Sequence, residues 1–223
     1  MRGALVVALS ALAFVALAPR SSAAADVKRR GGQFEGLFGV SACIPGRAEC
    51  KSEADVVGRT GPSFGMGFTL GFRPLRSLLI GGAYNVGFFN ANYLTGNADT
   101  YKLAYQNSLF GVIRAILPIW RVDLGLELAP GWSRQAFKLR DGAGYDDATK
   151  EYSQGFALKL APVVDFYITR HLFIGAKVDF IFNFHRQVCR EFMGGSRTCF
   201  DKSDKNQASV HQLIAGFHVG ATF

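Results

Sequence analysis

The sequence predicts an all-β fold, an eight-stranded antiparallel up-and-down transmembrane β-barrel. Three observations predict it. Bulky apolar residues alternate with small or polar residues along eight stretches of the chain, as expected for strands with one apolar face. Short and long connections take turns between these stretches. After residue 25, no apolar run approaches the roughly 20 residues that a membrane-spanning helix needs.

The composition fits a single folded domain of low charge. Of the 223 residues, 49% are hydrophobic and 19% are charged, and this charged share lies below the roughly 25% of soluble domains. The net charge is +8. Apart from the run Lys28, Arg29 and Arg30, the basic residues are scattered and match no nucleic-acid-binding motif, so we expect no nucleic-acid partner.

The first 25 residues are expected to be a cleaved signal peptide, followed by one barrel domain over residues 26–223. Arg2 supplies the positive start, residues 4–18 form an apolar run, and Ala23, Ala24 and Ala25 form a small-residue cleavage site. The apolar run is too short to span a bilayer as a helix.

The alternation is clearest at 63–73, where four phenylalanine or leucine side chains and Met66 share one face, and Ser, Gly and Thr occupy the other. The eight expected strands cover 34–43, 63–73, 78–90, 108–117, 121–133, 155–168, 172–185 and 210–223. The connections at 74–77, 118–120 and 169–171 are short, and those at 44–62, 91–107, 134–154 and 186–209 are long and polar.

This order of connections places every long loop at one end of the barrel and every short turn, with both termini, at the other. Outer-membrane barrels have the same asymmetry, with short periplasmic turns and longer extracellular loops. A tilted strand of about 11 residues covers roughly 26 Å along the membrane normal, which matches an apolar band about 25 Å tall.

The bulky face carries no charge at the strand centres and is therefore expected to face lipid. The opposite face carries Glu35, Arg114, Asp123, Glu127, Lys159, Asp165, Lys177, Asp179 and His218. An eight-stranded barrel has room inside only for side chains, and isolated buried ions are very costly. We therefore predict an interior ion-pair network of six residues: Arg114, Glu127, Lys159, Asp165, Lys177 and Asp179.

Two alternatives to this interpretation stay open. The interior charges could form a proton or ion path, although the presence of both signs and the narrow barrel favour ion pairs. The whole pattern could also belong to a secreted soluble barrel with its apolar face inward. A surface built from Ser63, Gly65, Gly67, Thr69 and Gly71 covers little, however, whereas a crowded barrel interior needs small residues.

The final strand carries apolar residues at alternate positions and ends on a phenylalanine. Phe217, Val219, Ala221 and Phe223 resemble the assembly signal that the barrel-assembly machinery recognises. With the eight strands, the loop asymmetry and the export signal, the chain resembles the small eight-stranded outer-membrane barrels of the OmpA transmembrane-domain and OmpX type. The resemblance implies residence in the Gram-negative outer membrane, contact with its lipids and lipopolysaccharide, a monomer, and work done by the loops.

The four cysteines form two close pairs, Cys43 with Cys50 and Cys189 with Cys199. In an exported chain, this even count indicates two disulfides, with free thiols or zinc as weaker alternatives. Both pairs fall in expected long loops. The loop at 186–209 has five basic and three acidic residues, a net charge of +2, and either contacts lipopolysaccharide phosphates or is merely solvated.

We expect no enzyme, cofactor or metal, and a structural, adhesive or binding role for the disulfide-braced loops. One alternative is a narrow channel for small apolar compounds, in the manner of OmpW-type barrels. Another is a lipid A-modifying enzyme. Its candidate groups are Ser209 and His211, with Asp204 as a third group, but a Ser-x-His pair arises easily by chance.

Overall fold

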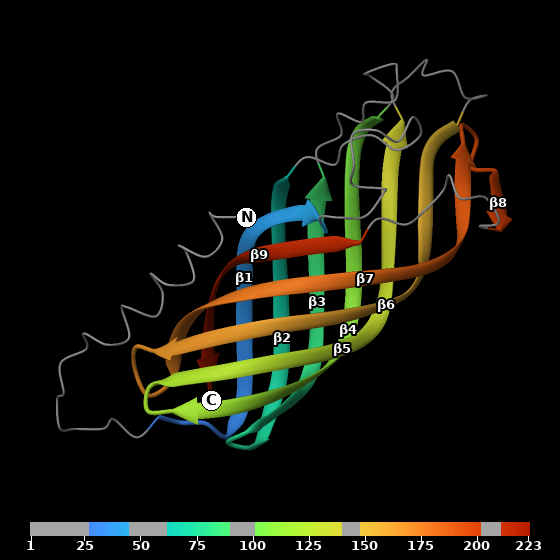
Figure 1. Ribbon diagram of the computed structural model, residues 1–223. Coiled ribbons are helices and arrows are strands. Elements are labelled where there is room, and N and C mark those ends of the chain that lie inside the picture. The colour runs from blue at the N-terminus through green and yellow to red at the C-terminus, as the bar shows by residue number, and fades with distance from the viewer. Residues whose placement is uncertain (1–26, 45–61, 90–100, 140–147, 202–210) are drawn as a thin grey trace.

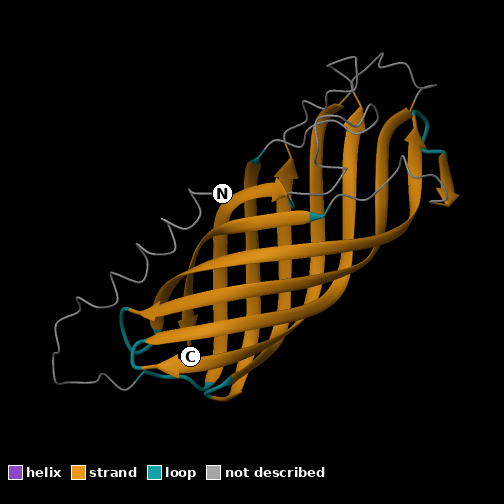
Figure 2. Ribbon diagram, viewed as in Figure 1, coloured by secondary structure: helices purple, strands orange, loops and turns teal. Residues whose placement is uncertain are grey.

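The computed structural model describes residues 27–44, 62–89, 101–139, 148–201 and 211–223. These residues form one antiparallel sheet joined by short loops (Figures 1 and 2). The strands are β1 (Gly31–Cys43), β2 (Ser63–Leu75), β3 (Leu78–Phe89), β4 (Tyr101–Ile119), β5 (Val122–Leu139), β6 (Ala148–Tyr167), β7 (Leu172–Phe192), β8 (Arg197–Asp201) and β9 (Gln212–Thr222). In the described part of the chain, we find no helix of the length and apolarity needed to cross a membrane. The expected signal peptide lies outside the described residues.

The sheet closes on itself. Consecutive strands from β1 to β7 pair antiparallel, β7 also pairs with β9, and β9 pairs with β1 along Gln33–Cys43. Strand β8 lies outside this ring and pairs with the end of β7. Closure lets every strand of the ring share its backbone N–H and C=O groups with two neighbours, which a sheet in lipid requires. The predicted eight-stranded up-and-down barrel is confirmed.

The two faces of the sheet are as different as the sequence predicts. The large apolar side chains point outward, with Leu70 62% exposed and Leu109 60% exposed. The interior face is buried and holds Arg114, Glu127 and Lys159. The arrangement of a soluble barrel, with apolar groups inside and charges outside, is therefore excluded for the described strands.

Four strands extend at least six residues beyond their predicted bounds at the end that carries the long connections. Strand β4 begins at Tyr101, β5 ends at Leu139, β6 begins at Ala148 and β7 ends at Phe192. The prediction that these stretches belong to long polar loops is therefore wrong. Above the apolar band the outward positions become polar, so the period-two pattern of hydrophobicity fades, whereas backbone pairing continues unchanged.

The extensions form a raised sheet on one side of the barrel, which Figure 1 shows rising beyond β1, β2 and β3. We use this name for 101–107 of β4, 134–139 of β5, 148–154 of β6, 187–192 of β7, and β8. A turn at 193–196 joins β7 to β8, and it contains Gly194 and Gly195 at positive φ (103° and 84°). These two left-handed residues let the chain reverse tightly, which makes a hairpin where the sequence indicated only a loop.

Candidate functional site

The interior of the barrel is crossed by an ion pair with two hydrogen bonds. The guanidinium of Arg114, on β4, donates to both carboxylate oxygens of Glu35, on β1, at 2.6 and 2.7 Å. It also donates to Oε2 of Glu127, its cross-strand neighbour on β5, at 2.7 Å. All three side chains are buried. This geometry ties β1 to β4 through the centre of the barrel, although the two strands are not neighbours in the sheet.

Glu127 is the centre of the charged layer. Besides Arg114, its carboxylate lies 2.7 Å from Nζ of Lys159 and 3.0 Å from Nζ of Lys177. The same two ammonium groups lie 3.9 and 3.6 Å from the carboxylate of Asp179. Two acids thus neutralise cations that come from three different strands.

Asp165 completes the layer on the side of the short turns. Its carboxylate lies 2.5 Å from Nε2 of His218 and 3.9 Å from Arg114. In the ladder it stands directly opposite Asp123, and two carboxylates in this position repel one another. The structure therefore brings together all six residues of the predicted network, and it adds Glu35 and His218 to them.

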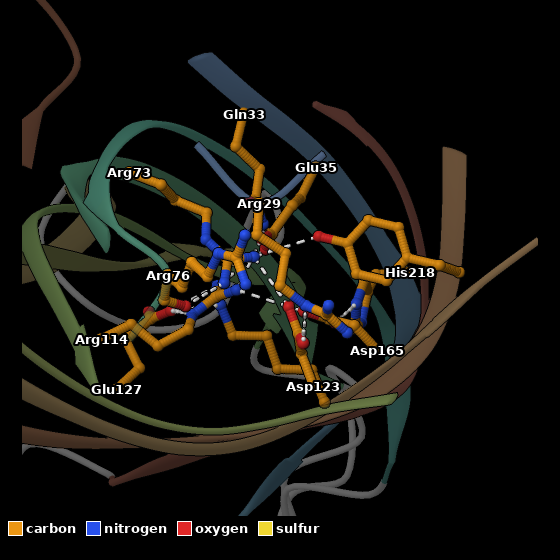
Figure 3. Close-up of polar contacts among 12 residues, drawn as sticks. Arg29, Gln33, Glu35, Arg73, Arg76, Arg114, Asp123, Glu127, Asp165 and His218 are labelled. Carbon is orange, nitrogen blue, oxygen red and sulfur yellow. Dashed lines mark hydrogen bonds and ion pairs between the residues drawn. The ribbon is translucent and has the colours of Figure 1, made fainter. Parts of the chain in front are cut away.

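Two arginines outside the predicted set neutralise Asp123. Arg73 and Arg29 each place a nitrogen 2.8 Å from its carboxylate, and Figure 3 shows these side chains converging within the barrel. With them the described layer holds five acids, Glu35, Asp123, Glu127, Asp165 and Asp179, against five permanent cations, Arg29, Arg73, Arg114, Lys159 and Lys177.

The sequence contained a signal for one of these arginines. Arg73 has the same odd-numbered parity as the small residues of β2, which predicts an inward side chain, but it lies at the edge of the expected strand. Arg29 precedes β1, so the period-two pattern of the strands does not predict where its side chain points. The segment before β1 lies across the short-turn end: the amide of Lys28 donates to the carbonyl of Arg170 at 3.0 Å, and Val27 packs on Tyr167 and Phe173.

A second layer of polar side chains lies toward the long-connection end. Both ring nitrogens of His185 lie 2.8 Å from serine hydroxyls, Ser133 on one side and Ser153 on the other. Ser133 also donates to Oδ1 of Asn183 at 2.6 Å, and the amide of Asn183 donates to Gln106 at 2.9 Å. These groups are buried. The network links β4, β5, β6 and β7 by hydrogen bonds.

One predicted disulfide is present, and of the other predicted pair only Cys43 lies within the described residues. Cys189 and Cys199 are directly opposite in the β7–β8 ladder and are joined by an S–S bond of 2.08 Å. Cys43 is disulfide-bonded, but its predicted partner Cys50 lies outside the described residues. The β7–β8 hairpin is thus covalently closed.

Of the three residues considered for catalysis, the structure describes only His211. His211 packs its ring against Phe182 and Phe184, at 5.6 and 6.3 Å between centroids. Its Nδ1 accepts a hydrogen bond from the backbone amide of Asn183 at 3.0 Å, which leaves this nitrogen occupied. Ser209 and Asp204 lie outside the described residues. Within the described ranges, no three His, Cys, Asp or Glu side chains are grouped to hold a metal.

The residues of the expected assembly signal lie on the outer face of β9 and, for Phe223, directly after its end. Phe217 is 79% exposed, Val219 and Phe223 are exposed, and Ala221 is half-buried. Phe223 exchanges two backbone hydrogen bonds of 2.8 Å with Gly32. A Cβ atom at Gly32 would lie 2.3 Å from the Phe223 ring, so a larger residue at position 32 would require this exposed ring to move.

Comparison with known proteins identifies the architecture. No protein-family model matches the sequence, and no curated protein matches it. A major outer membrane protein from Thermus thermophilus has a similar fold, with a TM-score of 0.56 and 10% identity over 86% of this chain and 99% of that one. OprG from Pseudomonas aeruginosa has a similar fold, with a TM-score of 0.52 and 10% identity over 86% of this chain and 97% of that one. Neisserial surface protein A, NspA, also has a similar fold, with a TM-score of 0.51 and 12% identity over 86% of this chain and 96% of that one.

The chain therefore has the fold of the small outer-membrane β-barrels. Its apolar exterior and its charged, filled interior are the reverse of a water-soluble barrel, and they fit a bilayer. The predicted resemblance to small eight-stranded outer-membrane barrels is confirmed at the level of the fold.

Proposed function

We propose that this protein is a closed barrel in the outer membrane of a Gram-negative bacterium, acting as a rigid anchor that holds the raised sheet outside the membrane. In this proposal the surface of the raised sheet and its hairpin performs the structural, adhesive or binding role. The signal peptide at 1–25 would direct export, and the barrel would insert as a monomer through the barrel-assembly machinery.

The observation that carries the proposal is the filled cross-section of the barrel. Arg114, Lys159 and Lys177 meet Glu35, Glu127 and Asp179 at one level, and all six side chains are buried. A barrel of eight strands has an interior just wide enough for side chains. Its charges therefore serve to hold opposite walls together, and this supports an anchor over a conduit.

The raised sheet supplies a surface for contact. All five residues of β8 are exposed, and among the apolar ones Phe200 is 46% exposed and, in the turn before β8, Met193 is 73% exposed. The disulfide between Cys189 and Cys199 fixes this hairpin to the sheet. A hairpin that is already ordered loses little conformational entropy when a partner binds.

Single-channel recording in planar bilayers tests the closed barrel. We expect no steady conductance from the refolded protein. A steady, reproducible conductance would overturn the proposal and favour the narrow channel for small apolar compounds.

Photo-crosslinking in living cells tests the display role. A benzoylphenylalanine at Met193 should capture surface macromolecules, whereas one at Leu128, an exposed position in the apolar band, should capture lipid. Identical lipid adducts at both positions would contradict the display role while leaving the closed barrel intact.

A further inference from the structure

The outward face of the raised sheet changes abruptly where the apolar band ends. The last apolar row across the strands is Leu109, Trp132, Phe156 and Phe184. The next outward row is Asn107, Arg134, Gln154, Gln187 and Asp201. Two further rows follow: Tyr105, Ala136, Tyr152, Cys189 and Cys199, then Leu103, Lys138, Lys150, Glu191 and Arg197. These three polar rows contain four basic and two acidic residues.

Three of the cations converge on one phenol. The guanidinium of Arg134 stacks over the ring of Tyr152 at 4.0 Å from its centroid, and Nζ of Lys150 lies 5.7 Å from the same centroid. Arg197 donates to the hydroxyl of Tyr152 at 3.2 Å. Although Tyr152 is on the outer wall, it is only 3% exposed. The three side chains, from β5, β6 and β8, therefore form a compact cationic cluster over Tyr152.

One hydrogen-bond donor of this cationic cluster has no acceptor among the described residues. The Nε atom of Arg134 is buried and has no hydrogen-bond acceptor in the described structure. A buried donor that stays unsatisfied destabilises the folded state.

A like-charge pair adds to this imbalance. Lys138 stands directly opposite Lys150 in the β5–β6 ladder, and like charges directly opposite one another are destabilising. Glu191 is 3.8 Å from Lys150, whereas the other cross-strand neighbour of Lys138 is Leu103. An anion between the two lysines would relieve this repulsion.

We propose that this basic face, formed by Arg134, Lys138, Lys150 and Arg197, binds the phosphate groups of lipopolysaccharide in the outer leaflet. The position supports a lipid source for the phosphate. With a rise of about 3.3 Å per residue and a tilt of about 40°, Arg134 stands about 5 Å beyond Trp132 along the normal, and Lys138 about 15 Å beyond it. A headgroup of phosphorylated sugars occupies this depth.

The residue types suit phosphate. The planar guanidinium of Arg134 can offer two parallel N–H donors to phosphate oxygens, and the lysine ammonium groups act as point charges beside it. Trp132, 44% exposed, marks the interface where aromatic side chains gather in membrane barrels. The proposed site uses the membrane location of the barrel and does not depend on the display role of the hairpin.

The test uses native mass spectrometry of the refolded full-length barrel with three probes: diphosphoryl lipid A, monophosphoryl lipid A and phosphatidylcholine. The double variant Arg134→Gln/Lys150→Gln removes two contacts, and Arg121→Gln is the control. Arg121 lies at the short-turn end, beside Trp120, and faces the opposite leaflet. Heat-modifiable migration in electrophoresis establishes that each variant is folded.

We expect the wild-type barrel to retain diphosphoryl lipid A best and phosphatidylcholine least. The double variant should lose retention about tenfold or more, because each basic side chain near an anionic surface contributes about 1 kcal/mol, and Arg121→Gln should match the wild type. Equal retention by the double variant and the wild type would overturn the proposal. Displacement of lipid A by millimolar inorganic phosphate would overturn the lipid source and indicate a site for free phosphate.

Discussion

Arg114 and Glu35 form a two-hydrogen-bond ion pair through the centre of the barrel, at 2.6 and 2.7 Å, between strands that are not neighbours in the sheet. The pair thus supports the curvature of the wall from inside, where backbone pairing cannot reach. Both groups are buried. Loss of Arg114 removes the cation that binds Glu35, whereas after loss of Glu35 the guanidinium of Arg114 still contacts Glu127.

Arg114→Met should therefore lower the free energy of unfolding by about 3 to 5 kcal/mol, the usual cost of breaking a buried ion pair. Urea unfolding of the refolded barrel, followed by tryptophan fluorescence, measures the change. The double variant Arg114→Met/Glu35→Leu should lose less than the sum of the single variants, because it leaves neither of these two charges without its partner. Strictly additive losses would contradict the pairing.

Arg29→Ala should release the segment before β1 from the short-turn end. Arg29 lies 2.8 Å from Asp123 and also donates to the carbonyl of Trp120. Hydrogen exchange should accelerate at the amide of Lys28, which is bonded to Arg170, while amides in the middle of β4 keep their protection. Unchanged protection at Lys28 would show that the packing of Val27 and the hydrogen bond from Thr222 to the Lys28 carbonyl hold the segment without Arg29.

Cys199→Ser should loosen the β7–β8 hairpin without unfolding the barrel. Closing so short a loop stabilises it by about 2 to 3 kcal/mol in the chain-entropy model. Limited proteolysis should cut the variant faster within 193–201, and the heat-modifiable shift of the barrel should remain. Rapid thiol labelling of the native wild type at Cys189 or Cys199, without reductant, would contradict the disulfide.

Phe223→Ala should impair assembly in cells more than it impairs folding in detergent. The side chain lies on the outer face of β9 and is 63% exposed, so its loss removes little interior packing. Folded barrel in isolated outer membranes should decrease, while refolding of the purified variant stays near the wild-type yield. Equal membrane levels of variant and wild type would argue against a targeting role.

The fold could be predicted because membrane strands carry a strong period-two contrast, as at Phe68 and Gly67 in β2. The six network residues could be predicted because a charge on the small-residue face of such a strand has only the interior to occupy. The raised sheet was missed because the outward positions of Arg134, Tyr152 and Lys150 are polar or amphipathic above the apolar band. The position of Arg29 could not be predicted because the segment before β1 is not a strand and has no periodic pattern of hydrophobicity.

The convergence of cations on Tyr152 could not be predicted for a related reason. Arg134 and Lys150 belong to strands β5 and β6, and their proximity depends on the register of that ladder, in which Arg134 faces Gln154 and Ala136 faces Tyr152. The register of the raised sheet continues the strand pairing of the apolar band below it. The polar sequence of the raised sheet has no hydrophobic pattern from which this register could be predicted.

We expect the apolar face of the sheet to contact lipid, and the charged face lines a filled interior. Quenching by bromine-labelled acyl chains tests it most directly, with Leu109→Trp and Phe110→Trp compared in a background in which Trp120 and Trp132 are phenylalanine. Leu109 is 60% exposed and its neighbour Phe110 only 3%. We predict strong quenching at position 109 and weak quenching at position 110; equal quenching, or the reverse order, would contradict the account.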